Sequence, residues 1–424
     1  MKLLTEAAGE CAADFATVRR GAEPSLDAFA RAVLGLVAEP GDGVLGRAIV
    51  AVGAPAVAEH LLARAPADAL VDAVVEAGGD LDEREANSAR DRWLPRLDHR
   101  GFVTSLAQAA RVGARLLVPG DPCWPTGVDE LGAHAPLALW VRGRVEALGG
   151  GQPTIALVGA RAATGYGEHV TMEASAGLVD RGFAIVSGGA YGIDGMAHRS
   201  ALASDGTTVA FLAGGVDRYY PLGHESLLAR IAETGAVVAE LPCGAAPTKW
   251  RFLQRNRLIA AASEATVVLE AGIRSGSLNT AGHAAALGRP IGAVPGPVTS
   301  PASAGCHRLL REFDAVCVVD ADQMAELVSG GGRRLWRGPA GAIVVDGAAG
   351  GEGEGAESSS PDERADPRLV RVLDALSTRT PRPLDDVARR AGLTVTEVMS
   401  VLGGLEAEGI AMRDARGWRR RRAG

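Results

Sequence analysis

The chain has 424 residues, with 47% hydrophobic and 22% charged side chains and a formal net charge of −7, which predicts a globular protein of roughly two to four domains. This acidic balance excludes a general polycation, so any contact with nucleic acid requires a local basic patch. Scattered cysteines without a CxxC pair argue against a disulfide framework or a zinc site, and the short apolar runs predict a cytoplasmic protein without membrane contact.

Residues 1–110 are predicted to form a small helical domain of the SAM or helix-hairpin-helix type. The segments 26–37 and 55–65 place apolar residues at three- and four-residue spacing, with little β-branched alternation. Between them, Gly41 and Gly43 form a Gly-x-Gly turn before a further helix. Such a turn can hold a DNA phosphate on its backbone amides or simply join two helices tightly, and the sequence leaves both interpretations open.

Residues 111–328 are predicted to form an α/β domain with a Rossmann-like, doubly wound parallel sheet. Short apolar strands alternate here with helix-length amphipathic segments, and nearly continuous apolar runs are typical of strands covered on both faces. Two strand candidates, at 115–120 and 137–143, lead directly into this domain. The strands of the main sheet are expected at 154–160, 184–189, 208–214, 236–241, 265–271, 290–296 and 315–320.

The rest of the chain is predicted to be a disordered linker, residues 329–365, and a winged-helix domain, residues 366–424. The linker is rich in Gly, Ser and Glu and has too little apolar surface to offset its ordering entropy. Three short helices and a β-hairpin indicate the winged helix, with Thr394 or Thr396 capping the third helix and Glu397 in its first turn. That helix carries acids and no cation, which argues against base readout in a DNA groove.

Ligands of a doubly wound sheet bind at the carboxyl ends of its strands, so the loops there are the candidate sites. The first loop, 158–167, lacks the GxGxxG spacing of a dinucleotide fingerprint, and no cofactor is predicted. It offers Arg161, whose guanidinium can fork onto a phosphate or form a surface ion pair. The second loop offers Gly188 and Gly189, which let the backbone approach a ligand closely, whereas His198 is expected to be structural.

The third candidate, residues 247–262, is the most basic stretch and contains one of the only two lysines in the chain. Cations beside aromatics suit a single-stranded nucleic acid, because phosphates need charge and unpaired bases need a stacking surface. A solvated basic helix face would show the same composition. The candidate binding residues are Lys249, Phe252, Arg255, Asn256 and Arg257. Lys249 is expected to meet a phosphate and Phe252 a base, whereas residues 255–257 are expected partly to hold the fold.

The fourth loop places Ser275, Gly276 and Ser277 at a helix start, an arrangement typical of an anion nest. Together the four loops predict a groove that binds phosphates along one edge of the sheet. They contain no catalytic triad, paired carboxylates or metal cluster, so no catalytic residue and no metal site are predicted.

These loops together resemble the motifs of the DprA family, also called the DNA-processing or Smf family. The resemblance is carried by VGARAATGYG, SGGAYGIDGMAH, FLQRNRLIA and SGSLNTA followed by AAALGRPIGAVPG, in this order along the chain. It covers residues 110–328 in detail, and the helical N-terminal and winged-helix C-terminal parts are similar to the family in their order.

The resemblance implies a recombination mediator without catalysis. Members of this family bind single-stranded DNA, dimerise, protect incoming DNA and load the RecA recombinase during natural transformation. Carried over by position, Arg161, Lys249 and Phe252 would contact the strand. The sequence departs from the family pattern at Ala160 and Tyr191, and at Leu253 and Gln254, and these departures bear on affinity more than on identity.

Two other functions are considered. The fold and topology also resemble the lonely-guy nucleotide phosphoribohydrolases, but AGIRSGSLNT places Asn279 and Thr280 where that chemistry needs acids. A sequence-specific regulator acting through the winged helix is disfavoured by the acidic third helix.

Overall fold

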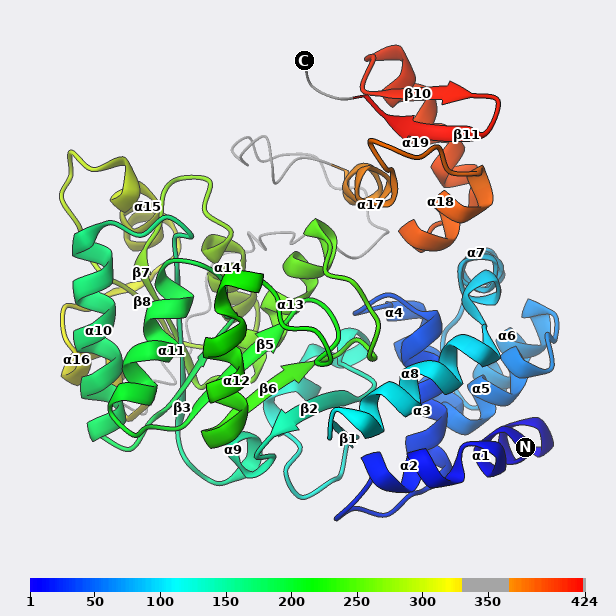
Figure 1. The fold of residues 1–424 in the computed structure, drawn as a ribbon, viewed down its shortest axis with the longest axis horizontal. Coiled ribbons are helices and arrows are strands. Elements are labelled where there is room, and N and C mark those ends of the chain that lie inside the picture. The colour runs from blue at the N-terminus through cyan, green and yellow to red at the C-terminus, as the bar shows by residue number, and fades with distance from the viewer. Residues whose placement is uncertain (330–365, 422–424) are drawn as a thin grey trace.

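The structure is a computed structural model that describes residues 1–329 and 366–421. Figure 1 shows a helical N-terminal part, a central sheet covered by helices and a small C-terminal unit. The predicted linker, apart from Ser329, lies outside the described residues. Ser329 itself ends the last helix of the sheet domain, so it belongs to that domain and not to the linker.

The N-terminal part is helical, as predicted. Its core includes Phe15, Phe29 and Phe102, whose rings meet edge to face at centroid distances of 5.2 and 5.4 Å. Its helices are α1 Lys2–Glu10, α2 Ala12–Val18, α3 Leu26–Val37, α4 Gly43–Val52, α5 Ala54–Leu62, α6 Ala67–Glu76, α7 Glu83–Trp93, η1 Leu94–Arg96 and α8 His99–Arg111. No single helix in the described residues is long and apolar enough to cross a membrane; by length and composition alone, only the bent pair α4 and α5 would be.

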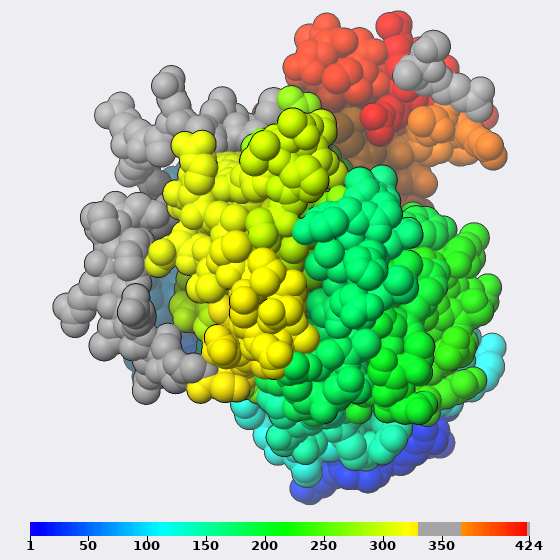
Figure 2. Space-filling model, turned by 90° about the vertical axis from the view of Figure 1, so that its left-hand side faces the viewer, coloured from blue at the N-terminus to red at the C-terminus, as the bar shows by residue number. Residues whose placement is uncertain are grey.

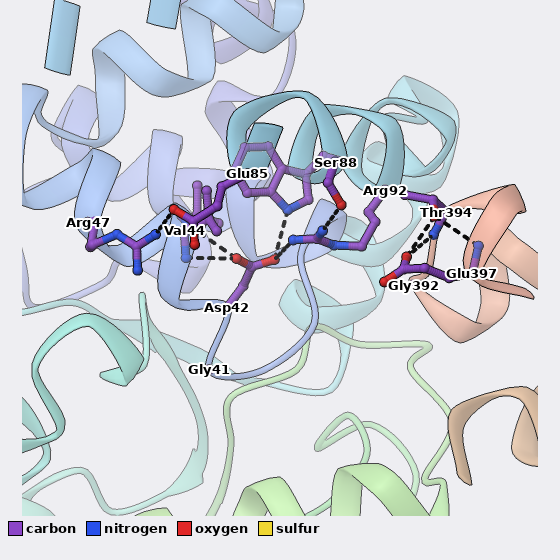
Figure 3. A network of polar contacts seen from close by, with 12 residues as sticks. Gly41, Asp42, Val44, Arg47, Glu85, Ser88, Arg92, Gly392, Thr394 and Glu397 are labelled. Carbon is purple, nitrogen blue, oxygen red and sulfur yellow. Dashed lines mark hydrogen bonds and ion pairs between the residues drawn. The ribbon is translucent and has the colours of Figure 1, made fainter. Parts of the chain in front are cut away.

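The Gly-x-Gly turn forms a tight connection into α4. Gly41 has a left-handed backbone, with φ of 74°. The carboxylate of Asp42 caps the helix by accepting the N–H groups of Val44 and Leu45, and Figure 3 shows it at the centre of a polar network. The N–H groups of Val44 and Leu45 in the first turn of α4 therefore already donate to a side chain of the protein itself. This favours the structural interpretation of the turn over a DNA contact.

The central sheet is mixed and mainly parallel. Its strands are β1 Arg115–Leu117, β2 Leu139–Gly143, β3 Thr154–Gly159, β4 Ala184–Ser187, β5 Thr208–Leu212, β6 Ala236–Ala239, β7 Ala265–Glu270, β8 Ile291–Ala293 and β9 Val316–Cys317. Their order is β1-β2-β6-β5-β4-β3-β7-β8-β9. The strands from β3 to β9 pair in parallel and confirm the predicted Rossmann-like sheet, whereas β1 and β2 add an antiparallel edge.

Helices cover both faces of this sheet. They are α9 Glu146–Gly149, α10 Gly165–Asp180, α11 Ile193–Ala203, α12 Glu225–Thr234, α13 Lys249–Ala261, α14 Ser277–Ala286, α15 Ala304–Glu312 and α16 Ala321–Ser329, with short 3-10 turns η2 Thr126–His134, η3 Leu222–His224 and η4 Pro301–Ser303. Within β3, Ala156 and Val158 pack with α13, α14 and α15, whereas Ile155 and Leu157 pack with α10, α11 and α16. Continuous apolar strand sequences follow from this burial on two faces.

The C-terminal unit has the predicted winged-helix order. It consists of α17 Pro367–Ala375, α18 Leu384–Ala391, α19 Val395–Ala407 and the antiparallel hairpin of β10 Ala411–Asp414 and β11 Gly417–Arg420. It has its own apolar core, and Figure 2 shows it as a lobe that stands away from the sheet domain. Thr394, rather than Thr396, caps α19, and Glu397 returns a bond to the Thr394 amide.

Candidate nucleic-acid interface

The predicted loops meet where the order of the strands reverses. From β3 the chain runs outward through β4, β5 and β6, and then returns to place β7 on the other side of β3. The carboxyl ends of β3 and β7 therefore flank the topological switch point, where ligands of such sheets bind. Arg161 follows β3, and the loop carrying Ser275, Gly276 and Ser277 follows β7.

Arg161 and Phe252 come together at this edge. The guanidinium carbon of Arg161 lies 5.2 Å from the centroid of the Phe252 ring, a distance typical of a cation–π contact. Arg161 is exposed and Phe252 is half-buried in the first turn of α13. Lys249, one turn earlier, is also exposed. Arg161 and Phe252, which are distant in sequence, thus meet at this edge, and exposed Lys249 lies three residues before Phe252 on the same helix.

The start of α13 is fixed by a local cap. The Thr248 hydroxyl accepts the N–H of Arg251 at 3.2 Å, and Thr at this position satisfies an amide that the helix leaves unpaired. Four positions further on, the helix enters the interior, and its residues from Arg255 onward are buried. At the start of the basic stretch Lys249 is therefore accessible, whereas Trp250 and the residues from Arg255 onward are buried.

Arg255 faces inward, in line with the expectation that it partly holds the fold. Its Nη1 donates to the carbonyls of Gly188 at 2.6 Å and Phe211 at 2.7 Å. Burial lowers its pKa to about 10, against the favourable charge of Asp194. A Cβ on Gly188 would lie 2.0 Å from this Nη1. Gly188 thus makes room for Arg255, and a contact of either residue with a ligand stays a prediction.

Arg257 and Asn256 also hold internal partners. Arg257 forms a two-pronged ion pair with Glu240, with N–O distances of 2.8 and 2.7 Å, and donates to the His134 carbonyl. Asn256 Nδ2 donates to Asn279 Oδ1 at 3.2 Å and so ties α13 to α14. These side chains are buried, because they join α13 to neighbouring elements. These bonds agree with the expected part of residues 255–257 in holding the fold, and direct contact of these residues with nucleic acid stays a prediction.

Some of the polar groups in the loop before α14 are hydrogen-bonded to one another. The Ser275 and Ser277 hydroxyls lie 2.7 Å apart, and the Ser277 N–H donates to Ser275 Oγ. Ser277 is buried, whereas Gly276 is exposed and no side chain caps the helix there. Gly189 requires glycine because its φ is 68°, and its carbonyl accepts from His224. Gly276 is the part of this predicted nest that is open to solvent.

The sequence analysis missed Tyr220, which follows β5 at the same edge. Its ring centroid lies 5.8 Å from that of Phe252, with planes tilted by 52°. One pattern in the sequence could have indicated it. Tyr220 is an aromatic residue in the loop after β5, and the strands on either side of β5 are also followed by candidate loops. His198, by contrast, is buried with its Nδ1 2.7 Å from the Thr208 hydroxyl, as expected for a structural residue.

The start of α13 also contacts the two flanking parts of the chain. Trp250 donates its backbone N–H to the Asp374 carboxylate in α17 at 3.0 Å, and Arg371 lies over the Trp250 ring. Arg251 pairs with Glu39 at 2.7 Å. Burial alone would raise the pKa of Glu39, but Arg251 and Arg96 outweigh it and hold that pKa well below its usual range. No pattern in the sequence indicates this three-part junction.

The site offers few groups for catalysis. Glu270, at the end of β7, accepts the Thr164 N–H at 2.8 Å and its hydroxyl at 2.6 Å, so this buried carboxylate fixes the start of α10. Asn279 and Thr280 carry no acid. Among residues 1–329 and 366–421, no group of three His, Cys, Asp or Glu side chains is placed to hold a metal ion.

Comparison with known proteins gives consistent matches. Residues 115–329 match a family model described as DNA recombination-mediator protein A, and residues 356–415 match a DprA winged helix domain. A DNA processing protein DprA of Mycobacterium tuberculosis is 46% identical over 325 residues, which are 74% of this chain and 79% of that protein.

Two solved structures are also similar. The X-ray structure of DNA processing protein A from Streptococcus pneumoniae aligns with 70% of this chain and 95% of its own, with a TM-score of 0.55 and 27% identity. A structure of DNA processing protein A from Helicobacter pylori, described for its single-stranded DNA binding mode, aligns with 51% of this chain and 96% of its own, with a TM-score of 0.47 and 27% identity.

Proposed function

Because the chain belongs to the family of DNA recombination-mediator protein A, also called the DprA or Smf family, we propose that it binds single-stranded DNA without catalysing a reaction on it. Family membership gives the chain a DNA-processing role in recombination. The finer proposal is that it protects incoming strands and loads the RecA recombinase on them during natural transformation. The observation that carries the DNA-binding part is the Arg161–Phe252 pair beside exposed Lys249 at the switch point.

Each group has a distinct task in this proposal. Arg161 and Lys249 neutralise phosphates, the exposed Gly276 end of α14 adds a backbone contact, and Phe252 stacks a base. None of these contacts reads the hydrogen-bonding edge of a base, so binding is expected to tolerate any sequence. Arg255, Asn256 and Arg257 keep the helix start in place from below.

The winged helix does not offer a competing base-reading surface. Glu397, in the first turn of α19, is bonded to Thr394, and the helix carries no Lys or Arg between Val395 and Ala407. A recognition helix needs donors for base edges and cations for phosphates. We therefore assign strand binding to the sheet domain, which functions as a homodimer in this proposal and is the part expected to meet RecA.

A length series of labelled oligo-dT strands tests the proposal. The double variant Arg161→Ala/Lys249→Ala should bind more weakly at every length, with the slope of log affinity against log salt reduced by about 0.7 for each lost phosphate contact. The matched control is Arg199→Ala/Arg230→Ala, which removes two exposed arginines from α11 and α12. Unchanged binding in the first variant, or equal loss in the control, would contradict the site.

The remaining parts need separate measurements. Sedimentation at several concentrations should show a dimer, and only monomer would contradict that part. Incubation with nucleoside monophosphates should release no free base, whereas release would support the phosphoribohydrolase alternative. Strand exchange by RecA on strands already bound by the protein should start faster, and an unchanged lag would contradict loading.

A further inference from the structure

We propose that Tyr220 is a second base-stacking residue of this interface and presents the open ring of an aromatic pair with Phe252. The inference rests on the proposed binding of single-stranded DNA and identifies a contact that the motifs do not contain. Tyr220 is 47% exposed, although it lies in a loop that touches the buried part of the site. An aromatic ring held open beside cations is the feature that an unpaired base requires.

The half-buried Phe252 ring already contacts three side chains of the protein. Arg161 and Arg255 place their guanidinium carbons 5.2 and 5.6 Å from its centroid. Tyr220 contacts it at 5.8 Å, within the range of direct ring contact, so no base fits between the two rings. A second base therefore reaches the outer surface of Tyr220 without displacing a cation. Phe252 supports the Tyr220 ring from behind, in addition to the stacking assigned above to its own exposed part.

Other contacts hold the Tyr220 loop in place. The Tyr191 hydroxyl accepts the N–H of Gly223 at 3.2 Å, and the Tyr191 ring packs edge-on against His224 at 4.8 Å. His224 in turn contacts the carbonyl of Gly189 at 3.0 Å. The loop is thus anchored to the loop after β4 on one side and to α13 on the other. This anchoring reduces the ordering that binding would otherwise have to supply. Tyr191 is a positioning residue in this arrangement.

Binding of oligo-dT and of an abasic deoxyribose-phosphate strand of equal length separates stacking from phosphate contact. In the full chain, Tyr220→Ala should weaken oligo-dT binding by about 5-fold or more and leave abasic binding and the salt slope unchanged. Tyr220→Phe should stay within about 2-fold of the unsubstituted protein, since the ring remains. Leu222→Ala is the matched control, because Leu222 is 73% exposed on the same loop but has no ring.

The outcomes distinguish this inference from the proposed function. If the unsubstituted chain fails to bind oligo-dT, the proposed function fails and Tyr220 stacking fails with it. If the chain binds but Tyr220→Ala binds equally well, only the Tyr220 inference is overturned. Equal weakening on oligo-dT and abasic strands, or an equal loss in Leu222→Ala, would show disturbance of the loop and would also overturn stacking.

Discussion

The two halves of α13 share a basic sequence but have opposite environments. In the first half, Lys249 is exposed and Phe252 is half-buried beside Arg161. In the second half, Arg255 and Arg257 are buried and bonded to carbonyls and a carboxylate inside the protein. A count of cations therefore overstates the candidate binding surface. Of Lys249, Arg251, Arg255 and Arg257, only Lys249 is exposed, and Arg251 is held by Glu39.

The largest expected effect tests the buried half. Arg257→Ala should lower the free energy of unfolding by about 3–5 kcal/mol, because it leaves Glu240 buried without its partner. Urea denaturation measures this change. The exposed Arg230→Ala should stay within about 0.5 kcal/mol. The double variant Arg257→Met/Glu240→Leu should recover much of the loss, and equal destabilisation by Arg230→Ala would contradict the division of α13.

A pH series tests the burial of His198 in α11, whose pKa the charge of the buried Arg255 also lowers. Burial, with the nearby charges of His224 and Arg255, lowers the pKa of His198 to about 3, below its ordinary value of 6.5. The folded protein therefore binds this proton less readily than the unfolded chain does. The contribution of neutral His198 to the free energy of unfolding is therefore fully present above pH 6.5 and is lost as the pH falls toward 3. The expected loss between pH 7 and 5 is about 2 kcal/mol. His198→Gln should flatten that part of the curve, and an unchanged slope would contradict a neutral buried His198.

Phe252→Ala tests the accessible half. It should reduce affinity for single-stranded DNA by about 1–3 kcal/mol through loss of stacking and of support for Tyr220. Phe252→Leu keeps much of the apolar volume without the ring and should lose a similar amount. If Phe252→Leu binds like the unsubstituted protein, apolar contact rather than an aromatic ring explains the affinity. Fluorescence anisotropy at fixed salt measures both variants.

The smallest effect is expected for Arg161→Lys. Charge is kept, but the planar group that lies over Phe252 is lost, which should cost about 0.5–1 kcal/mol of affinity. The free energy of unfolding should not change, because Arg161 is exposed. A loss of stability comparable to that of Arg257→Ala would place Arg161 with the structural cations instead.

The sheet and the edge where its candidate loops meet could be predicted from the sequence, because continuous apolar strands and the loops that follow them are local patterns. Arg161 and Phe252 were correctly expected at one edge. The sequence predicts a partly structural role for Arg255 and Arg257, but it does not identify the partners that bury them. Arg257 is buried because it pairs with Glu240, which directly follows β6, and Arg255 is buried because Gly188 leaves space for it. Such partners are distant in sequence and carry no pattern around the arginines themselves.

Tyr220 was missed because its partner, Phe252, is also distant in sequence. Its loop follows β5, and nothing within that loop indicates that its ring meets Phe252. Contact between them depends on how far α13 and the loop extend beyond the sheet. The sequence predicts which edge carries the site, whereas the packing of side chains above that edge requires the structure.

The bond between Trp250 and Asp374 has a thermodynamic consequence. A backbone amide at the start of α13 is occupied by a carboxylate of the winged helix. Any anion that takes this amide in place of Asp374 must loosen the docking of the C-terminal unit. By linkage, docking of the winged helix then lowers the affinity for that anion by the same factor. The position of the winged helix and the occupancy of the helix start are therefore two measures of a single coupling free energy.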